Sequence, residues 1–290
     1  MQIGLSTHAL LNHRLTSIWL ERIWNAGFPL VEIFCARQHF DYQDQAQINE
    51  LGHWFRDSEL KLHSLHSPKF SDDVGGRSGP RSYVNIAAPA KAQRIEAVAE
   101  VKRALEVAEV IPFHYLVQHL GAAQDEFDEE KMEAAFKSLE ELRLFAGQRG
   151  VEILLENTHN ELSTAERLHY FLNRTHLKMG YCFHTGHARL CGSVESEFNI
   201  MAEHIRSTHI NDNDGVRDLH SYPFEEPGTI DWPATMKLLG ARGDQFPFLL
   251  ELKSRPDIDQ PLERAKQTGD RLLSLIGPMW RDQCGVTNVT

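Results

Sequence analysis

The sequence predicts an α/β fold, a (β/α)8 TIM barrel formed by residues 1–290 as a single domain. Short β-type runs alternate with longer helical patterns eight times, mostly through short connections. Several runs, such as VEILLE and PFLLEL, are almost continuously apolar, which is typical of parallel strands covered on both faces. A doubly wound sheet is the structural alternative, but it more often carries a glycine-rich phosphate turn after its first strand, and none is present. We therefore expect a barrel without a nucleotide cofactor.

The expected elements follow the chain in strict alternation. The strands are expected at 3–7, 30–34, 60–66, 115–119, 151–157, 179–184, 205–211 and 246–252. The helices are expected at about 16–26, 44–57, 93–110, 129–148, 163–173, 194–204, 232–240 and 259–276. In the fourth helix Met132, Phe136 and Leu139 recur at helical spacing.

Local signals support several helix starts and one long loop. Asp128 and Asp231 stand where N-cap residues are favoured, and Ser163 with Glu166 fits a capping box. The connection over 68–92 contains several Gly and Pro residues and is far longer than the others. A connection of this length is commonly a lid or a binding loop.

Composition excludes several classes of protein. The net charge of −11 and the pI near 5.8 argue against a general binder of nucleic acid or of anionic membranes. The four cysteines, Cys284 among them, form no C-x-x-C pair, which argues against a disulfide scaffold. The N-terminus has no basic region followed by an apolar one, and no stretch reaches the ~18 apolar residues of a membrane span. A cytoplasmic protein is expected.

Histidine is unusually frequent, with 16 residues against 6 tyrosines. Active sites of such barrels lie at the carboxyl ends of the strands. Polar residues able to bind metal end most of the predicted strands or follow them closely: His66, His119, Glu156, His184, His187, His209, Asp218, His220 and Glu251. The strand predicted at 30–34 adds Glu32. Carboxylates at the end of a buried strand are costly unless they are compensated, and a divalent metal compensates them. Histidine with carboxylate suits zinc, manganese, iron or cobalt.

The motifs LLEN, FHTGHA, THINDN, PGTIDW and LLELK occur in that order. In this series the chain resembles the xylose isomerase-like TIM barrel superfamily, which includes sugar phosphate isomerases/epimerases, ketose 3-epimerases and endonuclease IV (AP endonuclease family 2). The resemblance spans essentially the whole chain. It implies a central metal held by Glu156, His184, His209 and Glu251. The family motif usually reads Asp-Thr-Gly-His where this chain has His184-Thr-Gly-His187. That change favours zinc, iron, cobalt or nickel over magnesium, with zinc the first choice and manganese less favoured.

The resemblance first implies a metal-dependent isomerase or epimerase of a sugar or sugar phosphate. Proton transfer next to a carbonyl would pass through an enediolate, with Glu156 and Glu251 as the acid/base pair. His187 and His220 would orient substrate hydroxyls or move protons. Glu32 would hydrogen-bond a substrate or a ligand histidine. His66 and His119 would also border the carbohydrate.

Two other activities stay open. An endonuclease IV-like phosphodiesterase would use three metals, with His66, His119 and Glu156 around one and His187, Asp218 and His220 around another. Lys69 and Arg77 in the long connection could contact phosphates, but such cations are sparse there and mixed with acidic residues, so a nucleic acid partner is not favoured. A lyase or dehydratase on the same scaffold is the third activity. Association into a homo-oligomer also stays open.

Overall fold

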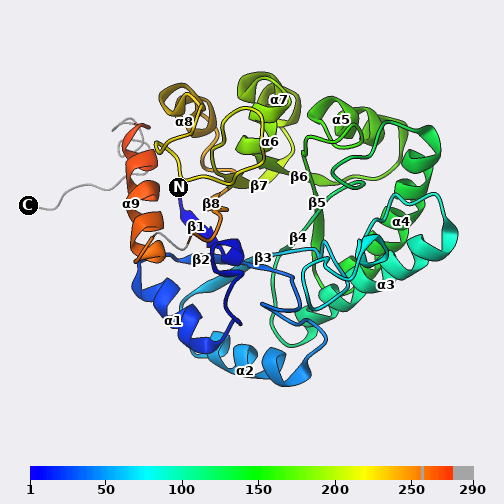
Figure 1. Cartoon of the computed structure of the whole chain (residues 1–290), viewed down its shortest axis with the longest axis horizontal. Helices are drawn as coiled ribbons and strands as arrows, with labels where there is room; N and C mark the ends of the chain where they lie inside the picture. The colour runs from blue at the N-terminus through cyan, green and yellow to red at the C-terminus, as the bar shows by residue number, and fades with distance from the viewer. Residues whose placement is uncertain (256–257, 277–290) are drawn as a thin grey trace, which may run out of the picture.

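Eight parallel strands form a closed barrel in the computed structural model, which describes residues 1–255 and 258–276. Each strand pairs with the next one in sequence, and β1 pairs with β8 to close the ring (Figure 1). This closure confirms the predicted barrel and rules out the doubly wound sheet. The strands are β1 Ile3–Ser6, β2 Leu30–Phe34, β3 Lys61–His66, β4 Tyr115–Gln118, β5 Glu152–Glu156, β6 Gly180–His184, β7 Ile205–Ile210 and β8 Phe248–Leu250.

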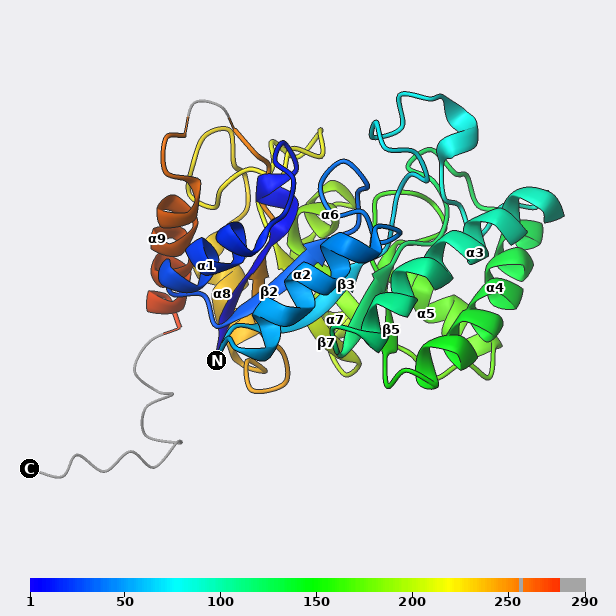
Figure 2. The ribbon, with the colours of Figure 1, turned by 90° about the horizontal axis from the view of Figure 1, so that it is seen from below.

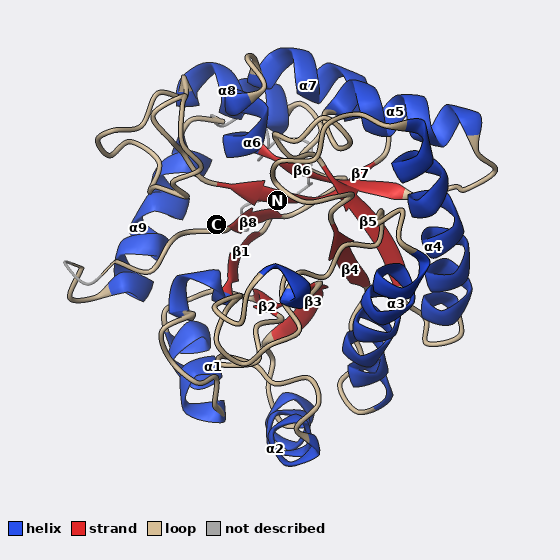
Figure 3. Ribbon diagram, turned by 45° about the vertical axis from the view of Figure 1, so that its right-hand side comes forward, coloured by secondary structure: helices blue, strands red, loops and turns tan. Residues whose placement is uncertain are grey.

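The helices surround the strands as an outer ring (Figure 3). They are α1 Ser17–Asn25, α2 Gln45–Arg56, α3 Lys91–Glu106, α4 Glu129–Gly147, α5 Ala165–Arg174, α6 Thr185–Leu190, α7 Val194–Met201, α8 Trp232–Gly240 and α9 Pro261–Ser274. Short 3-10 turns add η1 Thr7–Leu10, η2 Pro80–Ser82 and η3 Val107–Glu109. All eight predicted helices are found near their expected bounds. Helix α6 is additional: its six residues are too few to produce a periodic pattern.

The helix starts show one error of sequence reasoning. Asp128 and Asp231 each accept a hydrogen bond from a backbone N–H of the first turn, as expected of N-cap residues. The capping box predicted at Ser163 is wrong, because Thr164 caps α5. The Ser163 hydroxyl instead donates to the carbonyl of Leu120 at 2.7 Å. This bond ties the β5–α5 connection to the end of β4.

The barrel interior changes from apolar to polar toward the carboxyl ends of the strands. Val117, Leu154 and Cys182 form a small buried cluster separate from the main core. Side chains on a strand share one face at every second position. Two residues beyond Leu154 and Cys182, on that same face, stand Glu156 and His184. The period of the strands therefore brings the predicted site residues into the mouth of the barrel.

The connection after β3 is irregular, as expected, apart from η2. It extends beyond the barrel on the side where the strands end (cyan in Figure 2). Phe70 and Tyr83 form an antiparallel bridge that closes the base of this excursion. Among the described residues, no helix is both long and apolar enough to cross a membrane. Cys284 lies outside the described residues.

Candidate metal centre

Four residues predicted to hold the central metal meet at the mouth of the barrel. Glu156 ends β5, His184 ends β6, His209 lies in β7, and Glu251 directly follows β8. All four side chains are buried, and one ligand atom from each lies within 4.8 Å of the others. Four consecutive strands thus direct two imidazoles and two carboxylates at one point.

The distances within this group fit a small divalent ion. His209 Nδ1 lies 2.9 Å from Glu156 Oε1 and 3.4 Å from Glu251 Oε2. His184 Nε2 lies 3.0 Å from Glu251 Oε2 and 3.9 Å from Glu156 Oε1. Zinc bonds of ~2.0–2.2 Å in a tetrahedral arrangement place ligand atoms about 3.4 Å apart. The four observed spacings lie on both sides of that value, so spacing alone admits all four residues.

Glu32 fixes the orientation of His209. Its carboxylate accepts a hydrogen bond from His209 Nε2 at 3.1 Å, and the Ser64 hydroxyl donates to the same oxygen at 2.7 Å. Glu32 and His209 are fully buried. A carboxylate behind a histidine sets which ring nitrogen carries the proton and strengthens the other nitrogen as a ligand. His209 therefore presents Nδ1 to the centre of the site.

The charges of the group stabilise one another. Burial alone would raise the pKa of Glu156, but His119 and His209 outweigh it and hold the pKa well below its ordinary value. Burial would likewise raise the pKa of Glu251, yet His209 and His220 keep it well below. Burial would lower the pKa of His209, whereas the surrounding carboxylates hold it well above its ordinary value. A positive charge at this point is thus strongly favoured, and a divalent ion would replace the proton on His209 Nδ1.

A second group of predicted residues adjoins the first on the side of β3 and β4. His119 Nε2 lies 2.6 Å from Glu156 Oε2, and His66 Nε2 lies 3.4 Å from the same oxygen. Burial lowers the pKa of His119 to about 4 despite the neighbouring carboxylate. Neutral imidazoles are the form that binds metal. Glu156 could therefore bridge this group and the central one.

A third group lies on the side of β6 and the loop after β7. Asp218 places its oxygens 3.4 Å from His187 Nε2 and 3.1 Å from His220 Nε2. Burial would raise the pKa of Asp218, but His187 and His220 outweigh it and hold the pKa well below its ordinary value. With His159, residues His187 and Asp218 form a further set able to hold an ion. Every predicted site residue therefore lies in the three adjoining groups or, like Glu32, contacts one of their members.

Three further residues of the mouth were not among the predicted site residues. His159 stands three positions after Glu156, and that spacing beyond a strand end was an available signal. His8 follows β1, bonds through Nδ1 to the carbonyl of Leu252 at 2.9 Å, and lies 4.7 Å from the ring of His220. Asn211 follows β7, and its amide nitrogen donates to the Glu251 carbonyl at 3.0 Å. No sequence pattern marks Asn211, because its role depends on how β7 and β8 are aligned.

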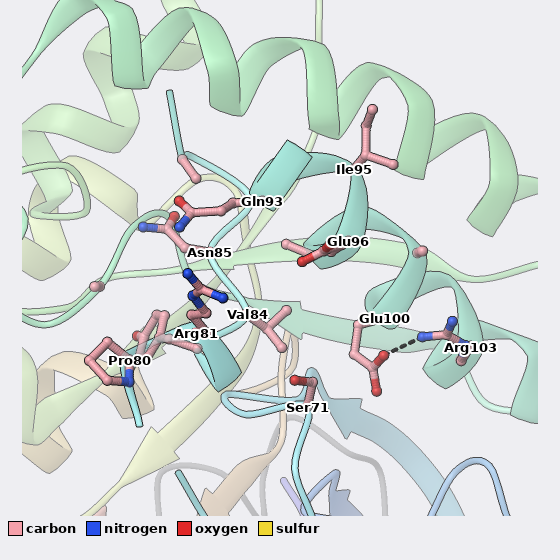
Figure 4. A pocket seen from close by; sticks show the side chains of 15 residues that line it. Ser71, Pro80, Arg81, Val84, Asn85, Gln93, Ile95, Glu96, Glu100 and Arg103 are labelled. Atoms are coloured by element: carbon pink, nitrogen blue, oxygen red, sulfur yellow. Dashed lines mark hydrogen bonds and ion pairs between the residues drawn. The ribbon is translucent and has the colours of Figure 1, made fainter. Parts of the chain in front are cut away.

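A separate cavity of about 630 Å³ lies between the long loop and α3. The side chains of Arg81, Asn85 and Gln93 converge at one end, while Glu100 and Arg103 pair at the other (Figure 4). None of the predicted site residues lines this cavity.

A closed (β/α)8 barrel with a cluster of histidines and carboxylates at its mouth defines a class of TIM barrels whose mouth offers ligands for a divalent metal. The chain belongs to the xylose isomerase-like TIM barrel family, whose model matches residues 20–275. This membership confirms the resemblance seen in the motifs.

Solved structures share this fold over nearly the whole chain. A D-tagatose 3-epimerase-like protein is 22% identical, with 95% of this chain and 98% of that chain covered and a TM-score of 0.77. An L-ribulose 3-epimerase is 18% identical, with 100% and 99% covered and a TM-score of 0.75. The IOLI protein, solved with a bound zinc atom, is 19% identical, with 96% and 100% covered and a TM-score of 0.74.

A curated relative is the uncharacterized protein y4fM of Sinorhizobium fredii, which is 26% identical over 212 residues. The aligned segment covers 66% of each chain, just under two thirds of the relative. At these identities the structural likenesses establish the fold.

Proposed function

We propose that the chain is a metal-dependent isomerase or epimerase of a sugar or sugar phosphate, acting by proton transfer next to a carbonyl. The observation that carries the proposal is the buried pair Glu156 and Glu251, whose carboxylates lie 2.9 and 3.4 Å from His209 Nδ1. The named epimerases among the structures of the same fold support it. Zinc is the favoured ion, because the group combines imidazole with carboxylate and one structure of the same fold holds zinc.

Glu156, His184, His209 and Glu251 are the residues placed to hold the ion. The ion, when bound, supplies a Lewis acid that polarises the substrate carbonyl. One carboxylate would take the proton from the carbon next to that carbonyl. The other would return a proton to the opposite face, or to the neighbouring carbon in an isomerase. His187 and His220, held by Asp218, would orient the substrate hydroxyls.

Solvent exchange tests this proposal even when the product has not been identified. The zinc-loaded chain, incubated in deuterium oxide with D-tagatose, D-fructose, L-ribulose and their phosphate esters, should place deuterium next to the carbonyl of at least one sugar. Glu251→Gln should abolish the exchange. Glu197→Gln is the matched control, since Glu197 is also buried but accepts a bond from Ala165 N in α5 and belongs to none of the three groups. Exchange that survives Glu251→Gln would refute the acid/base assignment.

A second candidate function is phosphodiester hydrolysis by several metals. The two further groups, His66 with His119 and His187 with Asp218, favour it, because both adjoin the central group. Metal analysis separates the two functions: one zinc per chain supports the isomerase, and three support the phosphodiesterase.

A further inference from the structure

His184 caps the helix that follows it. The Nδ1 atom of His184 accepts a hydrogen bond from the backbone N–H of His187 at 3.0 Å, which makes His184 the N-cap of α6. Helix α6 starts directly after β6, so the residue that ends the strand must also satisfy the first turn of the helix. One nitrogen of the ring is therefore already used as an acceptor.

An acceptor nitrogen carries no proton, so the proton of the neutral ring must lie on Nε2. A doubly protonated ring is excluded for the same reason, because it would carry a proton on Nδ1 and could not accept the His187 N–H. Nε2 lies 3.0 Å from Glu251 Oε2 and donates its proton there. This is the atom that faces the metal group, and an N–H cannot bind a metal.

Three other histidines of the mouth have the opposite arrangement. His209 directs Nε2 to the Glu32 carboxylate, while His66 and His187 direct Nδ1 to the carbonyls of Ser67 and Asn157 at 2.8 and 2.9 Å. Each of these rings can donate a proton to an oxygen away from the site and turn its other nitrogen toward the site. In His184 the arrangement is reversed: Nδ1 accepts the backbone N–H of α6, so the protonated Nε2 is the nitrogen that faces the site.

The amide of Asn211 does not compete with this assignment. Its nitrogen lies 3.1 Å from His184 Nε2, but it also has the Glu251 carbonyl at 3.0 Å and His220 Nδ1 at 3.2 Å. The Glu251 carbonyl is the oxygen acceptor for this amide, and a His184 ring that accepts at Nδ1 keeps its proton on Nε2, so Nε2 cannot accept from Asn211.

We propose that His184 is a neutral hydrogen-bond donor to Glu251 rather than a metal ligand, and that the central ion is held by Glu156, His209 and Glu251. This inference rests on the proposed function. A carboxylate in place of His184 has two oxygens, and so could cap α6 with one and bind metal with the other; a neutral imidazole has one lone pair for both tasks. Three protein ligands leave a position open for substrate. His184 then acts as a positioning residue that holds the Glu251 carboxylate.

The protonated nitrogen can be observed directly by ¹⁵N NMR of the histidine-labelled full chain. We expect His184 Nδ1 to be unprotonated and Nε2 protonated in the metal-free chain, and unchanged after one equivalent of zinc. A proton that moves to Nδ1 when zinc is added would overturn the proposal, because Nε2 would then be the ligand.

Metal affinity gives an independent readout, measured by competition with a chromophoric chelator. His184→Asn keeps an oxygen to cap α6 and an N–H group near Glu251, so the zinc affinity should stay within about threefold of the wild type. His209→Asn is the matched control and should weaken zinc at least about a hundredfold. Equal losses in the two variants would overturn the proposal. A wild-type chain that binds no zinc would refute the proposed function instead, while the proton position in the metal-free chain would still be measured.

Discussion

Asp212 organises the loop that carries two residues of the third group, and its removal should be costly. The Asp212 side chain is 1% exposed and accepts the indole N–H of Trp232 at 2.7 Å. It also accepts the backbone N–H groups of Thr229 at 2.9 Å, Ile230 at 3.1 Å and Asn213 at 2.8 Å. Asp212→Ala leaves three of these donors without an acceptor inside the protein, since the Thr229 N–H also bonds to the Asn213 carbonyl at 2.9 Å.

Each buried donor left unsatisfied costs roughly 1–3 kcal/mol, although water entering the new space would recover part of this. We expect Asp212→Ala to lower the free energy of unfolding by about 4 kcal/mol. For a chain of this size that corresponds to a fall in Tm of about 10 °C.

Urea and thermal unfolding followed by circular dichroism measure the effect. Trp232→Phe is the matched control, because it removes one donor together with the need for an acceptor; it should cost about 1–2 kcal/mol. A loss below about 1 kcal/mol for Asp212→Ala, or a loss equal to that of Trp232→Phe, would refute the reasoning.

Two further predictions concern other carboxylates. Glu32→Gln should weaken zinc about 10–100-fold, since second partners of ligand histidines have effects of that size; an unchanged affinity in the chelator competition would contradict the role of Glu32. Burial would raise the pKa of Asp125, but bonds from Ala122 N–H and Lys131 Nζ outweigh it and lower the pKa. The stability from Asp125 is therefore present at neutral pH and lost as pH falls from about 4 toward the lowered pKa. Asp125→Asn should cost about 2 kcal/mol at pH 7 and much less near pH 2 in urea titrations, and a cost independent of pH would disprove it.

The strands were predictable because each is buried on both faces, which forces short runs of apolar residues with polar residues at their ends. Glu156 and Glu251 could be identified for this reason: each ends such a run. Helix α6 could not, because six residues hold no helical period. The first turn of α6 sets which nitrogen of His184 carries the proton. Because α6 was not predicted, this proton position could not be predicted either.

Loop residues were harder to identify than strand residues. Asp218 and His220 were found from their motif, but the mutual contact of the two side chains depends on a turn in which His220 adopts a positive φ of 48°. The cap of α5 was misassigned to Ser163 because Thr164 next to it has the same chemistry, and only the tertiary bond to Leu120 distinguishes them. When two neighbouring residues have the same propensity to cap a helix, tertiary packing decides which of them does so. Local sequence does not encode that packing.

The barrel mouth is proposed to hold a catalytic divalent ion between β5 and β8. The most direct measurement is anomalous diffraction at the zinc edge from crystals of the full chain grown with one equivalent of zinc. We predict an anomalous peak within bonding distance of Glu156, His209 and Glu251. Zinc found only at other histidines, with no peak between these three side chains, would contradict the claim.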